Sequence, residues 1–338
     1  MKKTLVSFSI AALASLAGAV QAQTVLAVST WLPPAHPATL AQKDWCDLVS
    51  NETKGRIKCN YLPRAVSAPP GTFDAVKNGQ ADLSYTVHGY TPGRFLLTQM
   101  AELPFLGNSA ETISVAYSRV SAKHPEFNAE HQGVKVLTLW AHGPGIVFNT
   151  KHAIAKMDDL QGLKFRIGGG MVNEITKALG MNVTLKPATD SYELLSSGVM
   201  DGTLLPAEST ESFKIDKIIK HATTFPGGLY NTSFVFMMNQ AKYEKLSAED
   251  KKAVDEASGE VAARIYGRGW DKVDRRAFAL MQANGVVVTK ADAKFVGEIK
   301  AKTTPLEQGW IKAAEAKGLK NAAKVLADFR AEIAKLEK

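Results

Sequence analysis

Residues 160–170, LQGLKFRIGGG, place an arginine inside a short apolar strand that runs into three glycines. A buried guanidinium is costly unless a partner neutralises its charge. Its planar fork suits a carboxylate, which it can hold through two parallel hydrogen bonds. Arg166 is therefore predicted to hold an anion. That anion is either a ligand, which the glycines would allow to approach the backbone closely, or one of three nearby acids, Asp158, Asp159 and Glu174.

The residues that follow predicted strands form a second group of candidates. Open α/β sheets bind ligands at the carboxyl ends of their strands. This rule brings Arg166 together with seven further residues: Trp31, Tyr85, His88, Trp140, His142, Leu205 and Glu208. One arginine thus converges with several aromatic side chains and few acids. Each aromatic could equally belong to the hydrophobic core, and each histidine could be hydrogen-bonded within the fold.

A search for catalytic and cofactor motifs gives a negative result. The sequence contains no G-x-S-x-G elbow, no H-E-x-x-H pair, no C-x-x-C and no P-loop. The dinucleotide fingerprint fails at the glycines 168–170 because Asn173 occupies its last glycine position. None of the seven histidines has metal-ligand spacing. We therefore predict a binding protein without catalysis, cofactor or metal. The alternatives are a secreted α/β enzyme, with His88 or His142 as general base, and a sensory module.

The N-terminus has the pattern of a secretory signal peptide. A basic start, MKK, precedes an apolar stretch over residues 5–20 and a small-x-small cleavage site that ends at Ala22. A membrane anchor is the alternative, but serines interrupt the apolar stretch and no stop-transfer pattern follows. The mature chain is predicted to begin at Gln23 and to lie in the periplasm.

The composition is that of a soluble globular chain, with 45% hydrophobic and 22% charged residues in a length of 338. Without the two lysines of the signal peptide, 39 basic residues face 33 acidic ones, which gives a net charge of +6. The basic residues are scattered and have no interleaved aromatics, which argues against a nucleic acid partner. A mild positive charge favours anionic small molecules.

The chain contains two cysteines, Cys46 and Cys59. In an oxidising compartment an isolated pair forms a disulfide more often than a metal site. The bridge would join the first helix of the mature chain, residues 37–51, to its second strand, residues 56–62. Two free buried thiols are the alternative.

Alternating strands and helices predict an α/β fold with largely parallel sheets. An internal repeat favours two similar lobes with a cleft between them, because FDAVKNGQAD at 73–82 matches YELLSSGVMD at 192–201 without a gap. A helical pattern over residues 247–284 predicts one long helix that braces both lobes. The predicted divisions are a signal peptide, 1–22; lobe I, 23–146 with 232–246; lobe II, 147–231 with C-terminal helices; the long helix, 247–284; and C-terminal helices in 285–338, including 291–301 and 304–316.

Several segments resemble the DctP-type solute-binding proteins of tripartite ATP-independent periplasmic (TRAP) transporters. They include DDLQGLKFRI at 158–167, KALG at 177–180, YELL at 192–195 and GVMDG at 198–202. The resemblance continues through PPAH at 33–36, NGQAD at 78–82 and ELPF at 102–105. It implies a two-lobed periplasmic binding protein fold with the ligand in the cleft. It also implies that Arg166 holds the carboxylate of a small organic acid, that the permease subunits of a TRAP transporter are the partners, and that the protein is a monomer.

Two positions depart from the sialic-acid branch of that family, which has a second arginine and an asparagine there. Here they are apolar, Ile146 and Leu205, and they would leave the hydroxyls of a polyhydroxylated acid unmatched. We expect a small monocarboxylic 2-oxo or 2-hydroxy acid with an aromatic or branched tail. A sugar acid and a C4-dicarboxylate are the alternatives.

The remaining candidates are assigned to other parts of this acid. Four aromatic residues are expected along the tail, Trp31, Trp140, Phe148 and Tyr230. His88 and Glu208 could address a 2-oxygen. The family also includes a metal-assisted variant in which an ion bridges ligand and protein. No acidic cluster points to it here, although Asn149 and Glu208 could serve as ligands.

Overall fold

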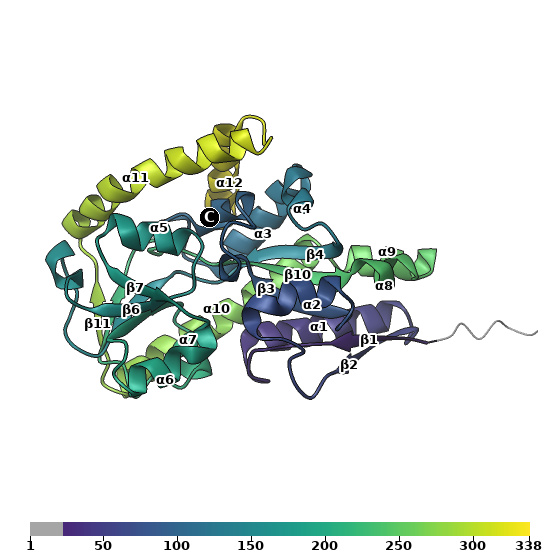
Figure 1. Cartoon of the computed structure of the whole chain (residues 1–338), viewed down its shortest axis with the longest axis horizontal. Coiled ribbons are helices and arrows are strands. Elements are labelled where there is room, and N and C mark those ends of the chain that lie inside the picture. The colour runs from purple at the N-terminus through teal and green to yellow at the C-terminus, as the bar shows by residue number, and fades with distance from the viewer. Residues whose placement is uncertain (1–22) are drawn as a thin grey trace, which may run out of the picture.

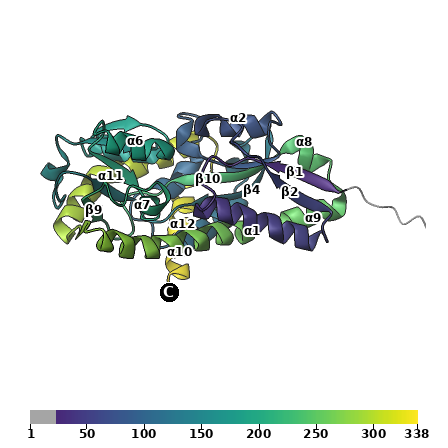
Figure 2. The same ribbon diagram turned by 90° about the horizontal axis from the view of Figure 1, so that it is seen from below.

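The computed structural model describes residues 23–338, so the predicted signal peptide lies outside the described residues. The chain folds into two α/β lobes that lie side by side, with a long helix along one side of both (Figures 1 and 2). This is the predicted two-lobed architecture. Within the described residues, none of the helices combines the length and the apolar character that crossing a bilayer requires.

Lobe I is built on a five-stranded sheet in the order β2-β1-β3-β10-β4. The strands are β1 (Thr24–Val28), β2 (Ile57–Tyr61), β3 (Leu83–Val87), β4 (Val134–Ala141) and β10 (Ser233–Asn239). The helices of this half are α1 (Pro37–Glu52), α2 (Thr72–Lys77), α3 (Ala110–Ala122), α4 (Glu126–Ala129) and α8 (Gln240–Glu244). Every residue of β3 and β10 is buried, as expected for the central strands of a covered sheet.

The second lobe contains a six-stranded sheet in the order β11-β9-β5-β8-β6-β7. The strands are β5 (Ile146–Asn149), β6 (Lys164–Ile167), β7 (Asn182–Leu185), β8 (Gly202–Leu205), β9 (His221–Thr224) and β11 (Val287–Lys290). Its short helices are α5 (Met171–Ala178), α6 (Ser191–Ser196) and α7 (Ser209–Ser212). β6 and β8 run parallel, so their carboxyl ends lie at the same edge of the sheet, beside lobe I.

The prediction of largely parallel sheets is wrong for one strand in each lobe. β10 runs antiparallel to both β3 and β4, and β5 runs antiparallel to both β8 and β9. A fully buried strand has the same continuous apolar sequence in either direction, so its pattern does not reveal its orientation. β10 carries the chain back from lobe II into the sheet of lobe I, which ties the two lobes together.

The predicted helix over residues 247–284 is two helices, α9 (Ala248–Glu256) and α10 (Glu260–Ala283). Gly259 separates them with a φ of +58°, and its amide donates to the carbonyl of Leu137 at 2.7 Å. Glycine adopts this left-handed conformation without steric cost. α10 packs on α1 and α3 of lobe I and reaches α7 of lobe II near its C-terminus, so it braces both lobes (Figure 2).

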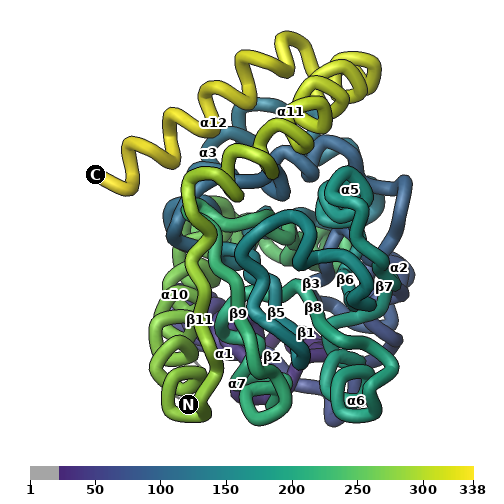
Figure 3. The backbone as a smooth tube through the Cα atoms, turned by 90° about the vertical axis from the view of Figure 1, so that its left-hand side faces the viewer, coloured from purple at the N-terminus to yellow at the C-terminus, as the bar shows by residue number. Residues whose placement is uncertain are grey.

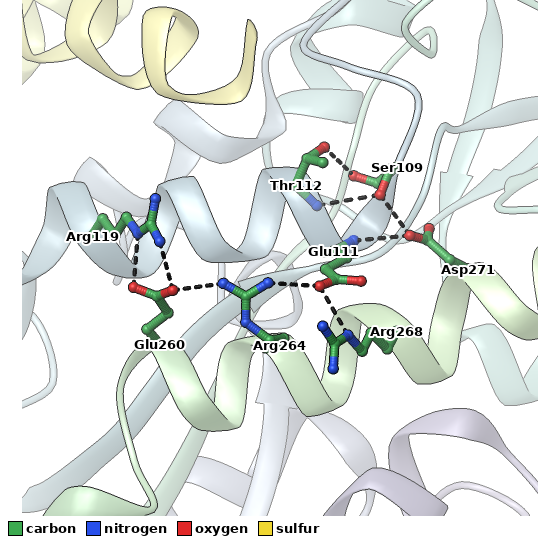
Figure 4. A network of polar contacts seen from close by, with 8 residues as sticks. All are labelled: Ser109, Glu111, Thr112, Arg119, Glu260, Arg264, Arg268 and Asp271. Atoms are coloured by element: carbon green, nitrogen blue, oxygen red, sulfur yellow. Dashed lines mark hydrogen bonds and ion pairs between the residues drawn. The ribbon is translucent and has the colours of Figure 1, made fainter. Parts of the chain in front are cut away.

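An alternating series of charges joins α3 to α10 (Figure 4). Glu260 pairs with Arg119 at 2.7 Å and with Arg264 at 2.6 Å, and Arg264 pairs in turn with Glu111 at 2.8 Å. The pairs are partly exposed, and networks stabilise a surface more than isolated pairs do. They fix the position of α10 on lobe I.

The C-terminal segment forms α11 (Ala293–Ala316) and α12 (Ala322–Leu336), which lie over one side of both lobes (Figure 3). The sequence predicts a break near residues 301–304, but α11 continues through Pro305. Proline removes one backbone hydrogen bond and crowds the preceding turn. Phe295, Ile299 and Trp310 on α11 are buried, and packing of this apolar face holds the helix together across the proline.

The predicted disulfide is confirmed. Cys46 on α1 and Cys59 on β2 are bonded, with their Cα atoms 6.0 Å apart. The bridge links the first helix to the edge strand of the lobe I sheet. Such a crosslink restricts the unfolded chain and thereby stabilises the lobe.

Candidate ligand-binding site

A cavity lies between the lobes, at the carboxyl ends of β6 and β8. About 430 Å³ of space between its side chains is free of protein atoms, including space that is open to solvent. Lobe I and its connections contribute Trp31, His36, Tyr90 and His142, α10 contributes Trp270, and lobe II contributes Arg166, Leu205, Glu208, Phe213 and Tyr230. The wall is therefore mostly aromatic and aliphatic, with a small number of polar groups.

Arg166 is the basic residue of this wall, and it is 1% exposed. Its Nε donates to the carbonyl of Lys186 at 2.8 Å, and Nη1 reaches the carbonyl of Leu204 at 3.5 Å. Nη2 is buried and has no hydrogen-bond partner among the described residues. Two backbone carbonyls thus orient the guanidinium, while its charge is left without a counter-ion from the described chain.

The three acids near Arg166 in sequence have other partners or none. Asp159 accepts the amides of residues 155 and 156, and Glu174 pairs with Lys177 at 3.0 Å. Asp158 forms no ion pair within residues 23–338. The alternative in which one of these acids neutralises Arg166 is therefore wrong.

Two tyrosines lie beside Arg166. The hydroxyl of Tyr90, from lobe I, accepts the amide of Ala188, from lobe II, at 2.9 Å. Burial raises the pKa of both Tyr90 and Tyr230, so both keep their protons at neutral pH. A protonated phenol can donate a hydrogen bond to an anion held by Arg166. Sequence reasoning missed Tyr90, although it follows His88 at the end of a predicted strand.

A buried acid, Glu208, lines the same cavity. It accepts hydrogen bonds from the hydroxyls of Ser209 at 2.7 Å and Ser212 at 2.6 Å, and His36 Nε2 lies 3.5 Å from Oε1. The amide of Glu208 donates to Asp274 on α10 at 2.7 Å. The loop after β8 is therefore fixed to both the helix that follows it and the bracing helix.

His142 follows β4 and also faces the cavity. Its Nδ1 lies 2.5 Å from the carbonyl of Gly143, so Nδ1 carries the proton of the neutral ring. Burial lowers the pKa of His142 to about 4. The neutral ring leaves Nε2 as a hydrogen-bond acceptor, and none of the described residues is hydrogen-bonded to it.

Aromatic rings form the rest of the wall. Trp31 lies 5.8 Å from Tyr90 between ring centroids, and its Nε1 donates to a backbone carbonyl at 2.9 Å. Trp270 on α10 packs 5.2 Å from His36 and 5.7 Å from Phe234. Sequence reasoning missed Trp270 because helical periodicity alone does not separate a core position from a cavity wall.

The structure brings four of the nine candidates together at the cavity, Arg166, Trp31, Glu208 and Tyr230. The other five do not line it. The Tyr85 hydroxyl oxygen is 2.5 Å from that of Thr30 and 3.0 Å from that of Thr39. The ring of Trp140 stacks on Phe234 and Tyr266, with centroids 4.0 and 4.4 Å apart. Phe148 is fully buried, and the side chain of Asn149 accepts the amides of Lys151 and His152. Tyr85, Trp140, Phe148 and Asn149 therefore have roles in the core and its turns.

His88, the fifth residue, belongs to a separate buried network. Its Nδ1 lies 2.8 Å from Ser233 Oγ, and its Nε2 lies 2.9 Å from His131 Nε2. Ser233 donates to Glu102 at 2.6 Å, and Glu102 accepts the amide of Met171 at 2.8 Å. The network thus joins lobe I to the first turn of α5 in lobe II. Burial lowers the pKa of both histidines, in His131 to about 4.

Within residues 23–338, no group of three or more histidine, cysteine, aspartate or glutamate side chains is arranged to hold a metal ion. The polar groups at the cavity include one cationic donor, two phenols, two acceptors and the unpaired indole N–H of Trp270. This set is suited to holding an organic anion by hydrogen bonds.

Comparison with known proteins places the chain among transport proteins. Residues 28–313 match the family described as bacterial extracellular solute-binding protein, family 7 (DctP). A curated relative, the outer membrane transporter protein TsaT of Comamonas testosteroni, is 32% identical over 327 residues, which is 96% of each chain. The 2,3-diketo-L-gulonate-binding periplasmic protein YiaO of Escherichia coli is 24% identical over 264 residues, covering 75% of this chain and 78% of YiaO.

Solved structures agree closely with the fold. A TRAP periplasmic solute-binding protein from Bordetella bronchiseptica, with bound (R)- and (S)-mandelate, is 42% identical with a TM-score of 0.90, covering 93% of this chain and 99% of its own. A marine metagenome TRAP protein specific for aromatic acids, with 3-hydroxybenzoate, is 33% identical with a TM-score of 0.86, covering 94% and 100%. A TRAP protein from Rhodoferax ferrireducens with copurified benzoate is 29% identical with a TM-score of 0.85, covering 93% and 98%.

The family match covers most of the chain, and the TsaT relative exceeds 30% identity over nearly its whole length. Both findings agree with the resemblance carried by the segments around Arg166. The chain belongs to family 7 of the bacterial extracellular solute-binding proteins, the DctP family of TRAP-type binding proteins.

Proposed function

We propose that this protein binds an aromatic monocarboxylic acid in the periplasm and delivers it to the permease subunits of a TRAP transporter. The acid is bound and released without chemical change. Arg166 binds the carboxylate, and Trp31, Glu208 and Tyr230 contact the remainder of the ligand. The protein acts as a monomer after removal of residues 1–22.

One observation carries this proposal. The Nη2 of Arg166 is buried at the cavity wall without a partner among the described residues. A buried unpaired guanidinium is strongly unfavourable, whereas a bidentate carboxylate satisfies both its charge and its free N–H groups. The phenols of Tyr90 and Tyr230 supply further donors to the same carboxylate.

The apolar part of the cavity favours an aromatic tail over a sugar acid. Leu205 lines the cavity and pairs in register with Ile146 on β5, so this part of the wall offers no side-chain hydrogen bond to a sugar hydroxyl. The three similar structures described above hold mandelate, 3-hydroxybenzoate and benzoate. A glucuronate-bound protein from Chromohalobacter salexigens is only 21% identical to this chain and supports the fold alone.

Thermal unfolding of the mature chain against a panel of acids tests the proposal. The panel contains benzoate, 3-hydroxybenzoate, mandelate, glucuronate and succinate. An aromatic acid at about 100 times its Kd adds about 2.7 kcal/mol of stability, which corresponds to roughly 4 °C in Tm for a chain of this length.

A shift with glucuronate or succinate that exceeds every aromatic shift would refute the aromatic ligand. Chromatography of each acid after prolonged incubation with the protein tests the absence of turnover. A new product would favour the enzyme alternative instead.

A further inference from the structure

We propose that Glu208 selects aromatic monocarboxylates that carry a hydroxyl group and rejects those that carry a second carboxylate. This inference rests on the proposed function, since it concerns the second polar group of an acid whose carboxylate lies on Arg166. Arg166 and Glu208 both line the cavity, and each is 1% exposed. They form no ion pair with each other in the described part of the chain. Each charge is therefore available to a different part of the ligand.

The surroundings of Glu208 favour its carboxylate form. Ser209 and Ser212 each donate a hydroxyl, one to each carboxylate oxygen, at 2.7 and 2.6 Å. His36 Nδ1 accepts the amide of Ala38 at 3.1 Å, which places the ring proton on Nε2, 3.5 Å from Glu208 Oε1. Burial on its own would raise the pKa of Glu208, but His36 and the two hydroxyls outweigh burial and lower it. Glu208 is therefore ionised at neutral pH.

The neighbouring acid on α10, Asp274, does not line this cavity. Asp274 is buried, and its Oδ1 accepts the amide of Glu208 at 2.7 Å. Burial, followed by the negative charge of Glu208, raises the pKa of Asp274 well above the ordinary value. Glu208 is therefore the acid among the described residues that line the cavity.

The free hydrogen-bonding capacity on this side of the cavity combines acceptors with one donor, because the indole Nε1 of Trp270 is buried without a partner among the described residues. A carboxylate offers roughly four lone-pair positions, and three donors approach Glu208 within the protein. His142 Nε2 adds a second acceptor. A ligand hydroxyl can donate to either group. A second ligand carboxylate would instead bring two like charges together in a poorly solvated site, which is strongly unfavourable.

An ammonium group is also attracted to a carboxylate, but the cavity suits it less well. An ammonium has three donors and a large desolvation cost. The side chains around Glu208 that face the cavity include the rings of Phe213 and Trp270, which offer no acceptor oxygen or nitrogen. A neutral hydroxyl needs one acceptor and carries no charge to desolvate. The geometry therefore favours a hydroxy acid over an amino acid.

Four probes that differ at one carbon test the inference by calorimetry with the mature chain. Phenylacetate, mandelate, phenylmalonate and phenylglycine carry hydrogen, hydroxyl, carboxylate and ammonium there. The wild type should bind mandelate roughly tenfold more tightly than phenylacetate, and phenylmalonate more weakly than phenylacetate. In the wild type the affinity for mandelate should exceed that for phenylmalonate, and Glu208→Gln should reduce the ratio of these two affinities by about tenfold or more.

The matched control is Glu211→Gln, which makes the same charge change at a partly exposed residue paired with Arg276 at 2.7 Å. It should leave the ratio unchanged. The inference is overturned if Glu208→Gln is folded by circular dichroism and has the same ratio of affinities for mandelate and phenylmalonate as the wild type. It is also overturned if the wild type binds phenylmalonate as tightly as mandelate. Tighter binding of phenylglycine than of mandelate would overturn it as well. The comparison of the four acids on the wild type needs no substitution, so it still tests the inference if Glu208→Gln fails to fold. Absence of binding by all four probes would instead contradict the proposed function.

Discussion

Arg166 combines complete burial with an incomplete set of hydrogen bonds. Two backbone carbonyls orient its guanidinium, and one terminal nitrogen is left without a partner among the described residues. Other buried polar atoms of the described chain are also unpaired, but Arg166 carries a charge, and a buried charge without a counter-ion is far more costly than an unpaired neutral group, which points to a function. The sequence predicted this role because an arginine in a short apolar strand is unusual.

The other site residues differ in how far the sequence could predict them. Glu208 and Trp31 follow strands at their carboxyl ends, and that rule found them. Tyr85 and Trp140 satisfy the same rule but point into the core. Whether a side chain faces the cleft or the core depends on the strand's register and on the helix packed against it, which a local sequence pattern does not contain.

A residue-scale prediction concerns the stability of the fold at low pH. Burial lowers the pKa of His142 from 6.5 to about 4, so acid favours the unfolded chain, which binds the proton more readily. The contribution of His142 is fully present above pH 6.5 and decreases as the pH falls towards 4. At pH 5 the loss is about 2 kcal/mol.

The comparison with His142→Asn isolates this effect, because asparagine keeps a donor for the carbonyl of Gly143 but does not titrate. Urea unfolding at pH 7.5 and pH 5 gives the free energy of unfolding of each protein. Between the two pH values the wild type should lose about 2 kcal/mol more than the variant. Equal losses would show that His142 is protonated in the folded state or solvated.

At the scale of elements, α10 depends on its contacts with α3 (Figure 4). Asp271 on α10 accepts the hydroxyl of Ser109 at 2.5 Å and the amide of Ala110 at 2.6 Å. Ser109 is itself the N-cap residue of α3. The carboxylate therefore compensates free amides at the positive end of the α3 dipole.

Asp271→Asn should lower the free energy of unfolding by about 1–2 kcal/mol, because it removes the charge and one of the two acceptor oxygens. The control is Asp328→Asn, which breaks an exposed pair with Lys324 and should cost less than about 0.5 kcal/mol. Urea denaturation measures both. Equal effects of the two substitutions would argue against a capping role for Asp271.

The sequence predicted most elements by type but missed several boundaries for physical reasons. Gly259 ends a helix because its backbone turns left-handed to meet Leu137, a contact made by a strand distant in sequence. Pro305 does not end a helix because buried residues on both sides hold it. In both cases tertiary contacts decide what local propensity leaves open.

At the scale of the whole molecule, the two lobes touch through backbone at Gly89 and Gly169. A Cβ on Gly89 would lie 2.6 Å from the carbonyl carbon of Gly169, a distance that real side chains do not adopt. Nearby, Tyr90 and Glu102 of lobe I each accept a hydrogen bond from a backbone amide of lobe II. The approach of the lobes therefore requires glycine at position 89.

Gly89→Ala should hinder closure without straining its own lobe, and the affinity for mandelate should fall by about tenfold or more because the closed state is less populated. Small-angle X-ray scattering should show less compaction on adding mandelate than in the wild type. Gly309→Ala, on α11 with open space around it, serves as the control and should bind normally. Normal compaction of Gly89→Ala would contradict this role for the contact.

The two-lobed arrangement was predictable because the internal repeat and the family resemblance both contain it. The antiparallel orientation of strands β5 and β10 was not predictable, since their partner strands lie far away in the chain. The cleft follows from the lobes, but its shape depends on α10, whose Trp270 closes one side.

The most direct test of the account is the affinity for mandelate of the wild type, Arg166→Ala and Arg166→Lys by isothermal titration calorimetry. The alanine variant should lose roughly 100-fold or more in affinity, because the carboxylate would be buried without its partner. Lysine keeps the charge but not the fork, so its affinity should be intermediate. If Arg166→Ala is folded and binds mandelate as tightly as the wild type, Arg166 is not the carboxylate-binding residue and the central claim is wrong.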